Sequence, residues 1–356
     1  MPRLALLLLF CAACTTAEVI DPTAEVALTP TVALDLSLGD GDSVLVGKLE
    51  DATRFPDGRI ALLDVDRRAV VFLDSTGRTM GVVGRRGEGP GEFQFPSSVG
   101  RCQADSLYVW DRGLARVSIF SPTGSYVREL RPAVTGAVQP GCLPDGKFVA
   151  LDASKVDGTP RLVDGVAPLL RGPLVVMTPD GAIFATVPDM AIGEVKLAGQ
   201  MGGIALAGDR VVVGLSSSNQ LTSFGVDGTP QGVDTVDLQP ALLTDARFEA
   251  LLERQARSTG SDSSMLVIVR RMLRAQGKPE MAPLFSSMHG APDGTVWWVT
   301  SLPVDTTMTL VGFRPDAPRR TLTLPAGVEV FEFGADYLLG KRTDSEGLER
   351  LMLWRW

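Results

Sequence analysis

The chain contains a single histidine, which limits the chemistry that its side chains can perform. His289 lies in the segment Ser287–Gly290, just before a Pro-Asp-Gly turn. A serine hydrolase would need a histidine as general base and a nucleophilic serine, often in a Gly-x-Ser-x-Gly turn. No such turn accompanies His289. The sequence therefore predicts a structural role for this histidine and no catalytic residues.

Glycines are concentrated between Gly84 and Gly91, where the sequence reads GRRGEGPG. A glycine-rich loop binds phosphate when it carries Gly-Lys-Ser/Thr and opens a helix. Here the glycines lead instead into Phe93 and a segment with strand character. We therefore expect a loop between strands rather than a nucleotide site.

The composition is that of an ordinary globular protein, with 45% hydrophobic residues and a net charge of -8. A chain that binds nucleic acid would usually be basic, so no nucleic-acid partner is predicted. After the N-terminus, no segment approaches the roughly 20 apolar residues that a membrane-spanning helix needs.

The first 14 residues have the pattern of a signal peptide, with one basic residue, an apolar run from Leu4 to Ala13, and small residues before Cys14. The Ala-Ala-Cys ending resembles the lipobox of bacterial lipoproteins, although Cys11 stands where that motif usually has Leu. The resemblance implies that Cys14 is acylated and anchors the chain on the periplasmic or outer side of a bacterial membrane. Cleavage by the ordinary signal peptidase is the alternative. Residues 15–30 lack apolar periodicity and predict a tether.

A turn followed by an alternating strand recurs six times along the chain. The copies begin at Pro56, Asp105, Pro144, Asp209, Pro292 and, more weakly, Asp336. A second strand follows each copy and ends near Phe72, Phe120, Met177, Phe224, Phe313 and Trp354. Units of roughly 40 to 57 residues with about four short strands are typical of propeller blades. The sequence predicts an all-β fold, a six-bladed β-propeller over residues 31–356.

The last unit ends at Trp356 before it can supply a fourth strand. A missing outer strand would leave an unpaired edge. The segment Thr31–Leu38 has the alternation to fill it, so we predict that this segment pairs with the strand at Leu351–Trp354 and closes the ring.

The second unit carries the most specific pattern. It reads Gly84–Pro96, with Gly-Glu-Phe inside it, and continues with Leu107–Asp111, Arg116–Phe120 and Gly124. This pattern resembles the NHL repeat. The other units resemble NHL and TolB-like propellers in their turns and strands only. The resemblance implies a six-bladed propeller.

Some propellers with a similar skeleton are enzymes, and their ligand sets can be compared with this chain. Amidating lyases bind zinc through several histidines. Gluconolactonase-like and paraoxonase-like enzymes hold calcium with Glu, Asn and Asp, and Asn219 is the only asparagine here. We therefore predict no metal site and no cofactor. A non-enzymatic binding or scaffolding propeller is the favoured interpretation, and a metal-dependent, lactonase-like hydrolase with carboxylates at the channel mouth is the alternative.

One segment, about 240–279, interrupts the blade pattern. Its two halves have apolar residues at three- and four-residue steps, which is the spacing of amphipathic helices. We predict a helical hairpin inserted between the fourth and fifth blades. It is either a decoration on the propeller rim or a lid over a ligand.

Two cysteines remain after the signal peptide, in an oxidising compartment. Cys102 and Cys142 each lie three residues before the aspartate of their unit, so they occupy equivalent places on the innermost strands of adjacent blades. A disulfide needs Cα atoms within about 7 Å. The sequence leaves open a bridge or two buried free thiols.

A binding face is predicted by topology. The loops between blades, and those joining second to third strands, open onto one end of the channel, where pockets form. The residues placed on this face are Arg85, Arg86, Glu88, Glu92, Asp64, Arg67, Asp111, Arg112 and Asp152. Arginine side chains there would bind an unknown protein or carbohydrate ligand. Alternatively, these charges pair with one another in solvent while Phe93 is buried between sheets.

Overall fold

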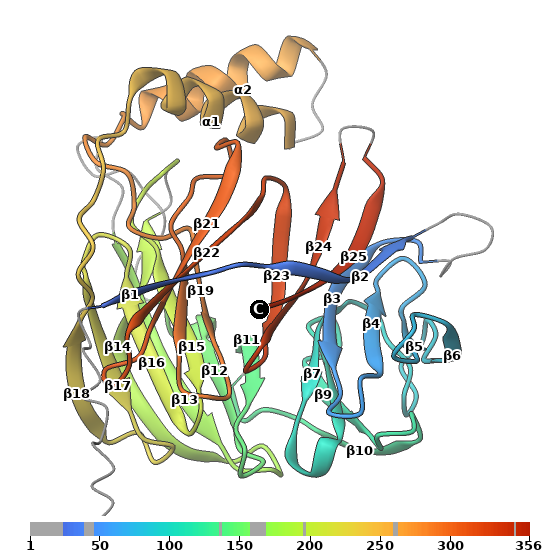
Figure 1. Cartoon of the computed structure of the whole chain (residues 1–356). Coiled ribbons are helices and arrows are strands. Elements are labelled where there is room, and N and C mark those ends of the chain that lie inside the picture. The colour runs from blue at the N-terminus through green and yellow to red at the C-terminus, as the bar shows by residue number, and fades with distance from the viewer. Residues whose placement is uncertain are drawn as a thin grey trace, which may run out of the picture.

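The computed structural model describes residues 24–38, 46–134, 137–156, 169–194, 197–258, 263–344 and 347–356. These residues form six sheets, whose innermost strands contact one another from blade to blade (Figure 1). The predicted six-bladed β-propeller is confirmed. The signal peptide, Cys14 and most of the predicted tether lie outside the described residues.

Blades one to three follow the chain in order, each with its first strand innermost and its neighbouring strands antiparallel. Their strands are β3 (Leu49–Arg54), β4 (Ile60–Asp64), β5 (Ala69–Leu73), β6 (Thr79–Val83), β7 (Pro96–Arg101), β8 (Leu107–Asp111), β9 (Arg116–Phe120), β10 (Tyr126–Leu130), β11 (Ala137–Cys142), β12 (Phe148–Asp152), β13 (Leu169–Met177) and β14 (Ile183–Glu194).

Blades four to six complete the ring, and the N-terminal strands β1 and β2 join the last two of them. Their strands are β15 (Gly202–Ala207), β16 (Arg210–Leu215), β17 (Gln220–Phe224), β18 (Pro230–Thr235), β19 (Ser287–Gly290), β20 (Val296–Val299), β21 (Thr307–Phe313), β22 (Arg319–Pro325), β23 (Val328–Phe333), β24 (Tyr337–Thr343), β25 (Glu349–Arg355), β1 (Glu25–Leu28) and β2 (Thr31–Ser37).

The middle strands of a blade are buried on both faces, because another blade packs on either side. Every residue of β4, β5, β8, β9 and β12 is buried. The outer strands β6 and β18 are largely exposed. This arrangement explains why the middle strands read as nearly continuous apolar runs, whereas the outer strands have mixed composition.

The hydrophobic core is divided among the blade interfaces. One cluster of buried side chains lies at each of the six interfaces between adjacent blades. Between blades one and two, for example, Phe55 and Phe72 pack with Phe93 and Phe120. The core is therefore a set of radial layers between sheets rather than a single central volume.

The repeated Pro-Asp-Gly sequence forms the hairpin turns, as its residue types predict. In the first blade, the Gly58 N–H donates to the Phe55 carbonyl at 3.0 Å, and Gly58 has a φ of +93°. Few side chains adopt this left-handed backbone conformation, so glycine is favoured at this position.

The ring closes through the N-terminal strand, as predicted. Strand β2 pairs antiparallel with β25, with Thr31 opposite Arg355 and Leu36 opposite Leu351. Blade six thus has the order β2-β25-β24-β23, with the N-terminal strand outermost. The pairing covers the edge of β25 that the end of the chain would otherwise leave open.

The predicted tether of residues 15–30 is too long, because Glu25–Leu28 form a strand. Strand β1 pairs parallel with β22 and gives blade five a fifth strand. Its side chains are mainly exposed, and four residues are too few to show an apolar alternation in the sequence. The free edge of β22 and the ion pair of Glu25 with Arg319 stabilise it.

A buried lysine fastens blade six to blade one. The Lys341 ammonium donates to the Leu49 carbonyl at 2.6 Å and to a Glu349 carboxylate oxygen at 3.0 Å. Glu349 in turn accepts from the Leu49 N–H at 2.9 Å. Charge-assisted hydrogen bonds of this kind are stronger than neutral ones, so the closing seam is held by both apolar packing and polar contacts.

The insertion between blades four and five is a helical hairpin of α1 (Asp245–Ser258) and α2 (Ser263–Ala275), at the top of Figure 1. On its inner side, Leu243, Phe248 and Leu252 pack against Leu302 of the propeller. No helix in the described ranges has both the length and the apolar character to cross a membrane.

Cys102 and Cys142 are joined in a disulfide, with Cα atoms 5.3 Å apart. Cys102 directly follows β7 and Cys142 ends β11, so the two residues occupy the equivalent positions that their spacing indicated. The bond links the innermost strands of blades two and three and lines the channel.

The closing strand gives a direct test of the fold. Deleting residues 31–38 should expose the edge of β25 and remove packing from the interface between blades six and one. We expect aggregation and a lower melting temperature, measured by size-exclusion chromatography and thermal unfolding. Deleting residues 15–23 from the mature chain is the matched control and should leave both measurements unchanged. A monomeric, equally stable 31–38 deletion would contradict the closure by this strand.

Candidate functional site

Three aspartates of the predicted binding face are buried at the ends of second strands. Asp64, Asp111 and Asp152 each lie at most 1% exposed. Asp111 accepts from four backbone N–H groups, including Gln94 at 2.6 Å and Gly113 at 2.9 Å. Asp64 and Asp152 accept from backbone N–H groups in the same way. These carboxylates fix the adjoining loops and are not available at the surface.

The glycine-rich loop is held by its own residues. The Glu92 carboxylate accepts from the Gly89 N–H and from Arg85, both at 2.8 Å, and these contacts lower the pKa of Glu92. The Glu88 side chain accepts from the Gln94 amide. Two of the predicted binding charges therefore pair with each other, which was the alternative interpretation of this face.

Arg116 organises this loop, and the binding-face prediction did not include it. Its guanidinium is buried and donates to the carbonyls of Glu88, Gly89 and Glu92 at 2.6–3.1 Å. It also pairs with Glu129 on β10 at 2.6 Å. The loop consequently lies over the outer strands of blade two rather than beside the axis. The sequence could have indicated this residue, because the NHL-like unit contains Arg116-Val117 at the start of its third strand, β9.

Phe93 is completely buried, and its ring centroid lies 6.0 Å from that of Phe120. Arg67, Arg86 and Arg112 remain exposed. Of these three, Arg112 lines a cavity at the channel mouth, of about 550 Å³, together with Trp110 and Met190. The predicted face thus separates into structural residues and a few exposed arginines.

The largest cavity described lies along the propeller axis, with a volume of about 760 Å³. The innermost strands of all six blades line it, including Asp51, Ser98, Arg101, His289 and Glu332. Ser98 Oγ is buried and has no hydrogen-bond partner within the described part of the chain. The channel wall is therefore polar at several points and apolar between them.

Asp51 is the most perturbed carboxyl of this channel. Burial raises its pKa to about 8, although the backbone N–H groups of Val99 and Ala52 oppose the shift. Its Oδ2 accepts from Val99 at 2.9 Å, so it joins blade one to blade two. The nearby Glu332 carboxylate accepts from Thr53 and from Tyr337, which joins blade six to blade one.

His289 lies on the innermost strand of blade five. Burial lowers its pKa to about 4, so the imidazole is neutral at physiological pH. Its Nε2 lies 3.0 Å from Ser287 Oγ, and its ring packs near Phe333. No carboxylate orients the ring among the hydrogen bonds of the described residues, so the serine and histidine lack the third group of a catalytic triad.

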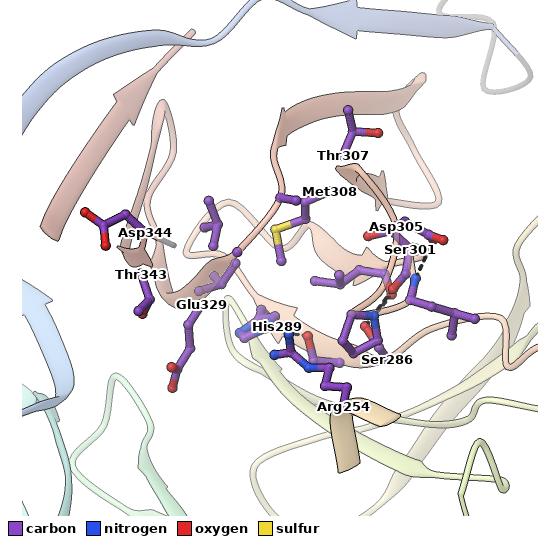
Figure 2. Close-up of a pocket in the computed structure, with 18 residues that line it drawn as sticks. Arg254, Ser286, His289, Ser301, Asp305, Thr307, Met308, Glu329, Thr343 and Asp344 are labelled. Carbon is purple, nitrogen blue, oxygen red and sulfur yellow. Dashed lines mark hydrogen bonds between the residues drawn. The ribbon is translucent and has the colours of Figure 1, made fainter. Parts of the chain in front are cut away.

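A second cavity of about 690 Å³ opens from the channel beneath the helical hairpin. It shares Ser286, Ser287 and His289 with the axial cavity. In Figure 2, Arg254 extends into it from α1, and Glu329 enters it from β23. The hydroxyl-bearing residues Ser286, Ser287, Ser301, Thr307 and Thr343 line its wall. We call this space the mouth cavity.

The charges around the mouth cavity are unequally compensated. Asp305 pairs with Arg247 at 2.7 Å, and Glu329 pairs with Lys341 at 3.3 Å. Arg254 is exposed and has no ion pair or hydrogen bond to any described residue. An anionic group of a ligand could therefore neutralise this guanidinium without breaking an existing contact.

Polar contacts hold the hairpin over this cavity. The Arg247–Asp305 pair joins α1 to the propeller, and within the insertion Lys278 donates to the Leu243 carbonyl at 3.0 Å, which closes the base of the hairpin. Gln276 accepts from the Leu197 N–H, which ties the end of α2 to the segment after blade three. The hairpin is thus a fixed wall of the mouth cavity in this structure.

No group of three or more His, Cys, Asp or Glu side chains lies together in a way that could hold a metal ion, as far as the described residues extend. The arrangement that would favour a metal-dependent hydrolase, several carboxylate oxygens converging on one point, is not found among them.

No family profile matches the chain, and no curated protein matches its sequence. Solved structures do match. A predicted exported protein from Bacteroides fragilis has a TM-score of 0.50 and 13% identity, covering 94% of this chain and 99% of that one. A Staphylococcus aureus virginiamycin B lyase has a TM-score of 0.46 and 9% identity, covering 91% and 99%. A gluconolactonase from Xanthomonas campestris has a TM-score of 0.44 and 14% identity, covering 95% and 99%. At these identities, the likeness concerns the fold alone.

The different roles of Phe93 and the exposed arginines can be separated by mutation. Phe93→Ala should leave a cavity between blades one and two and cost about 3–5 kcal/mol of unfolding free energy. The double change Arg85→Ala and Arg86→Ala should leave the melting temperature almost unchanged, because both side chains are exposed. Chemical denaturation measures the unfolding free energy, and thermal unfolding measures the melting temperature. Equal destabilisation by the two variants would show that the arginines belong to an internal network.

The raised pKa of Asp51 predicts a pH dependence of stability. A carboxyl whose pKa is higher in the folded state binds its proton more tightly there, so its contribution is lost as the pH rises from about 4 to about 8. The wild-type melting temperature should fall between about pH 5 and about pH 8, and Asp51→Asn should reduce that fall. His289 acts in the opposite direction, since its lowered pKa weakens the fold in acid, and it is present in both proteins. An undiminished fall in Asp51→Asn would assign the effect to other groups.

Proposed function

We propose that this protein is a non-enzymatic binding propeller that holds a hydroxyl-rich, acidic ligand, such as a carbohydrate with a carboxylate, in the mouth cavity. The observation that carries the proposal is the uncompensated Arg254 guanidinium facing a cavity lined by hydroxyl groups. Serine and threonine hydroxyls can both donate to and accept from the hydroxyls of a sugar. The guanidinium would fix the orientation of the sugar by binding its carboxylate. The cavity volume of about 690 Å³ lies within the range usual for small-molecule sites.

We place the protein on the extracytoplasmic side of a bacterial membrane, anchored by a lipid on Cys14. The signal-like N-terminus and the Ala-Ala-Cys ending support this location, and a disulfide is compatible with an oxidising compartment. The pattern from Gly84 to Gly124 supports a grouping with NHL and TolB-like propellers.

We propose binding without catalysis because of the state of the side chains that line the mouth cavity. His289 is neutral and half-buried, and the hydroxyl it contacts, that of Ser287, has no second base among the described contacts. Of the three described acidic side chains that line the cavity, Asp305 and Glu329 are each engaged by a base, and Asp344 accepts from the Leu348 N–H. These groups support orientation of a ligand rather than proton transfer to it.

Isothermal titration calorimetry with digalacturonate, and with maltose as the uncharged comparison, tests the proposed site. We expect the acidic disaccharide to bind more tightly, and Arg254→Gln to weaken its binding by roughly 1.5–3 kcal/mol, the range for a hydrogen bond to a charged group. Arg271→Gln is the matched control, because Arg271 is an exposed arginine on α2 that does not line the cavity. It should bind as the wild type does.

Two results would contradict this function. Equal losses in Arg254→Gln and Arg271→Gln would place any binding outside the mouth cavity. Hydrolysis of a sugar lactone that depends on added calcium would instead favour the metal-dependent hydrolase, and the same calorimetric cell can follow that reaction by its heat.

A further inference from the structure

The outward side of α2 carries apolar side chains that nothing in the described structure covers. Val267 is 67% exposed, Ile268 is 52% exposed and Met272 is 65% exposed. Arg271 lies among them, because residues four positions apart share one side of a helix. The opposite side of α2 packs inward through Leu273. We call Val267, Ile268, Arg271 and Met272 the outer face of α2.

The hairpin is a basic region of an acidic protein. Residues 240–279 contain seven Lys or Arg against four Asp or Glu, a net charge of +3, whereas the whole chain has -8. Several of these bases are paired with acids of α1, as in Arg270 with Glu253 and Arg274 with Glu249. Arg271 is exposed and has no such partner among the described residues. The outer face therefore combines apolar area with uncompensated positive charge.

The N-terminal strand begins beside the segment that leads into the hairpin. Arg319 on β22 pairs with Glu25, the first residue of β1, and it also donates to the Asp237 carbonyl at 2.6 Å. Asp237 lies between β18 and α1. Ten residues, 15–24, separate Cys14 from Glu25. An extended chain of that length reaches about 35 Å at most, so a lipid on Cys14 would hold the membrane within about that distance of Glu25.

We propose that the outer face of α2 docks onto an anionic membrane surface, with Val267, Ile268 and Met272 in the interfacial region and Arg271 at lipid phosphates. A helix with apolar side chains on one side and bases beside them binds such a surface through both buried apolar area and charge. This inference rests on the lipid anchor of the proposed function, because a single anchor is reinforced by a second contact. Docking of the outer face on a second copy is disfavoured by the positive charge that both copies would bring together.

Vesicle sedimentation tests the docking without the acyl group. The mature chain with Cys14→Ser is mixed with phosphatidylcholine vesicles that contain about 30% phosphatidylglycerol, and with vesicles of phosphatidylcholine alone. We expect binding to the anionic vesicles only, and a loss on raising the salt concentration to about 0.5 M. Ile268→Asp should lower the partition coefficient by about tenfold, because it places a carboxylate against the anionic surface.

Ile183→Asp provides the matched control. Ile183 on β14 is 48% exposed, close to the value for Ile268, and it lies in blade three rather than on the hairpin. This variant should bind as the unsubstituted protein does. Thermal unfolding should show that both aspartate variants remain folded, because both isoleucines are exposed.

Three outcomes would overturn the inference. The first is equal binding to neutral vesicles, and the second is an equal loss in Ile183→Asp and Ile268→Asp. The third is no vesicle binding together with a dimer that Ile268→Asp dissociates, which would make the outer face an interface between copies. Acylation is measured separately from the mass of the wild-type protein, so a missing acyl group would contradict the proposed anchor without changing the vesicle result.

Discussion

The pairing of β2 with β25 is the interaction on which the rest of the structure depends. A ring of sheets has no free interface only if its first and last blades meet, and here β2 joins the last three strands in blade six. The apolar layer between blades six and one and the buried Lys341–Glu349 pair then hold that seam. With the ring closed, the six innermost strands enclose the axial cavity. The packing of the blades therefore holds the side chains of its wall in place.

Closure also determines where polar groups can act. Asp64 and Asp111 end second strands at the same level of adjacent blades, and the packed sheets bury them, so their oxygens bind backbone N–H groups instead of a ligand. Arg116 is buried in the same way and serves the glycine-rich loop. At the channel mouth, where we propose that a ligand binds, the hairpin brings Arg254 over strands of blades five and six.

The hairpin gives the molecule an asymmetric charge distribution. Its inner side completes the mouth cavity, and its outer face displays apolar side chains and Arg271. The remainder of the chain is acidic. One insertion thus separates the two surfaces for which we propose ligands, the mouth cavity on its inner side and the outer face of α2.

The sequence by itself determined the six blades, the closing strand, the burial of Phe93 and the place of the helical insert, because turn residues, strand alternation and helical spacing are local patterns that repeat. It also placed Cys102 and Cys142 on equivalent strands, without deciding their state. Only the tertiary structure decided that Asp64 and Asp111 are buried, that Arg116 holds a loop, and that Arg254 faces the channel mouth. Those outcomes depend on the packing of one blade on the next and of the insert on blades five and six. A charged residue reads the same in a sequence whether its neighbours in space are water, a backbone N–H or an opposite charge.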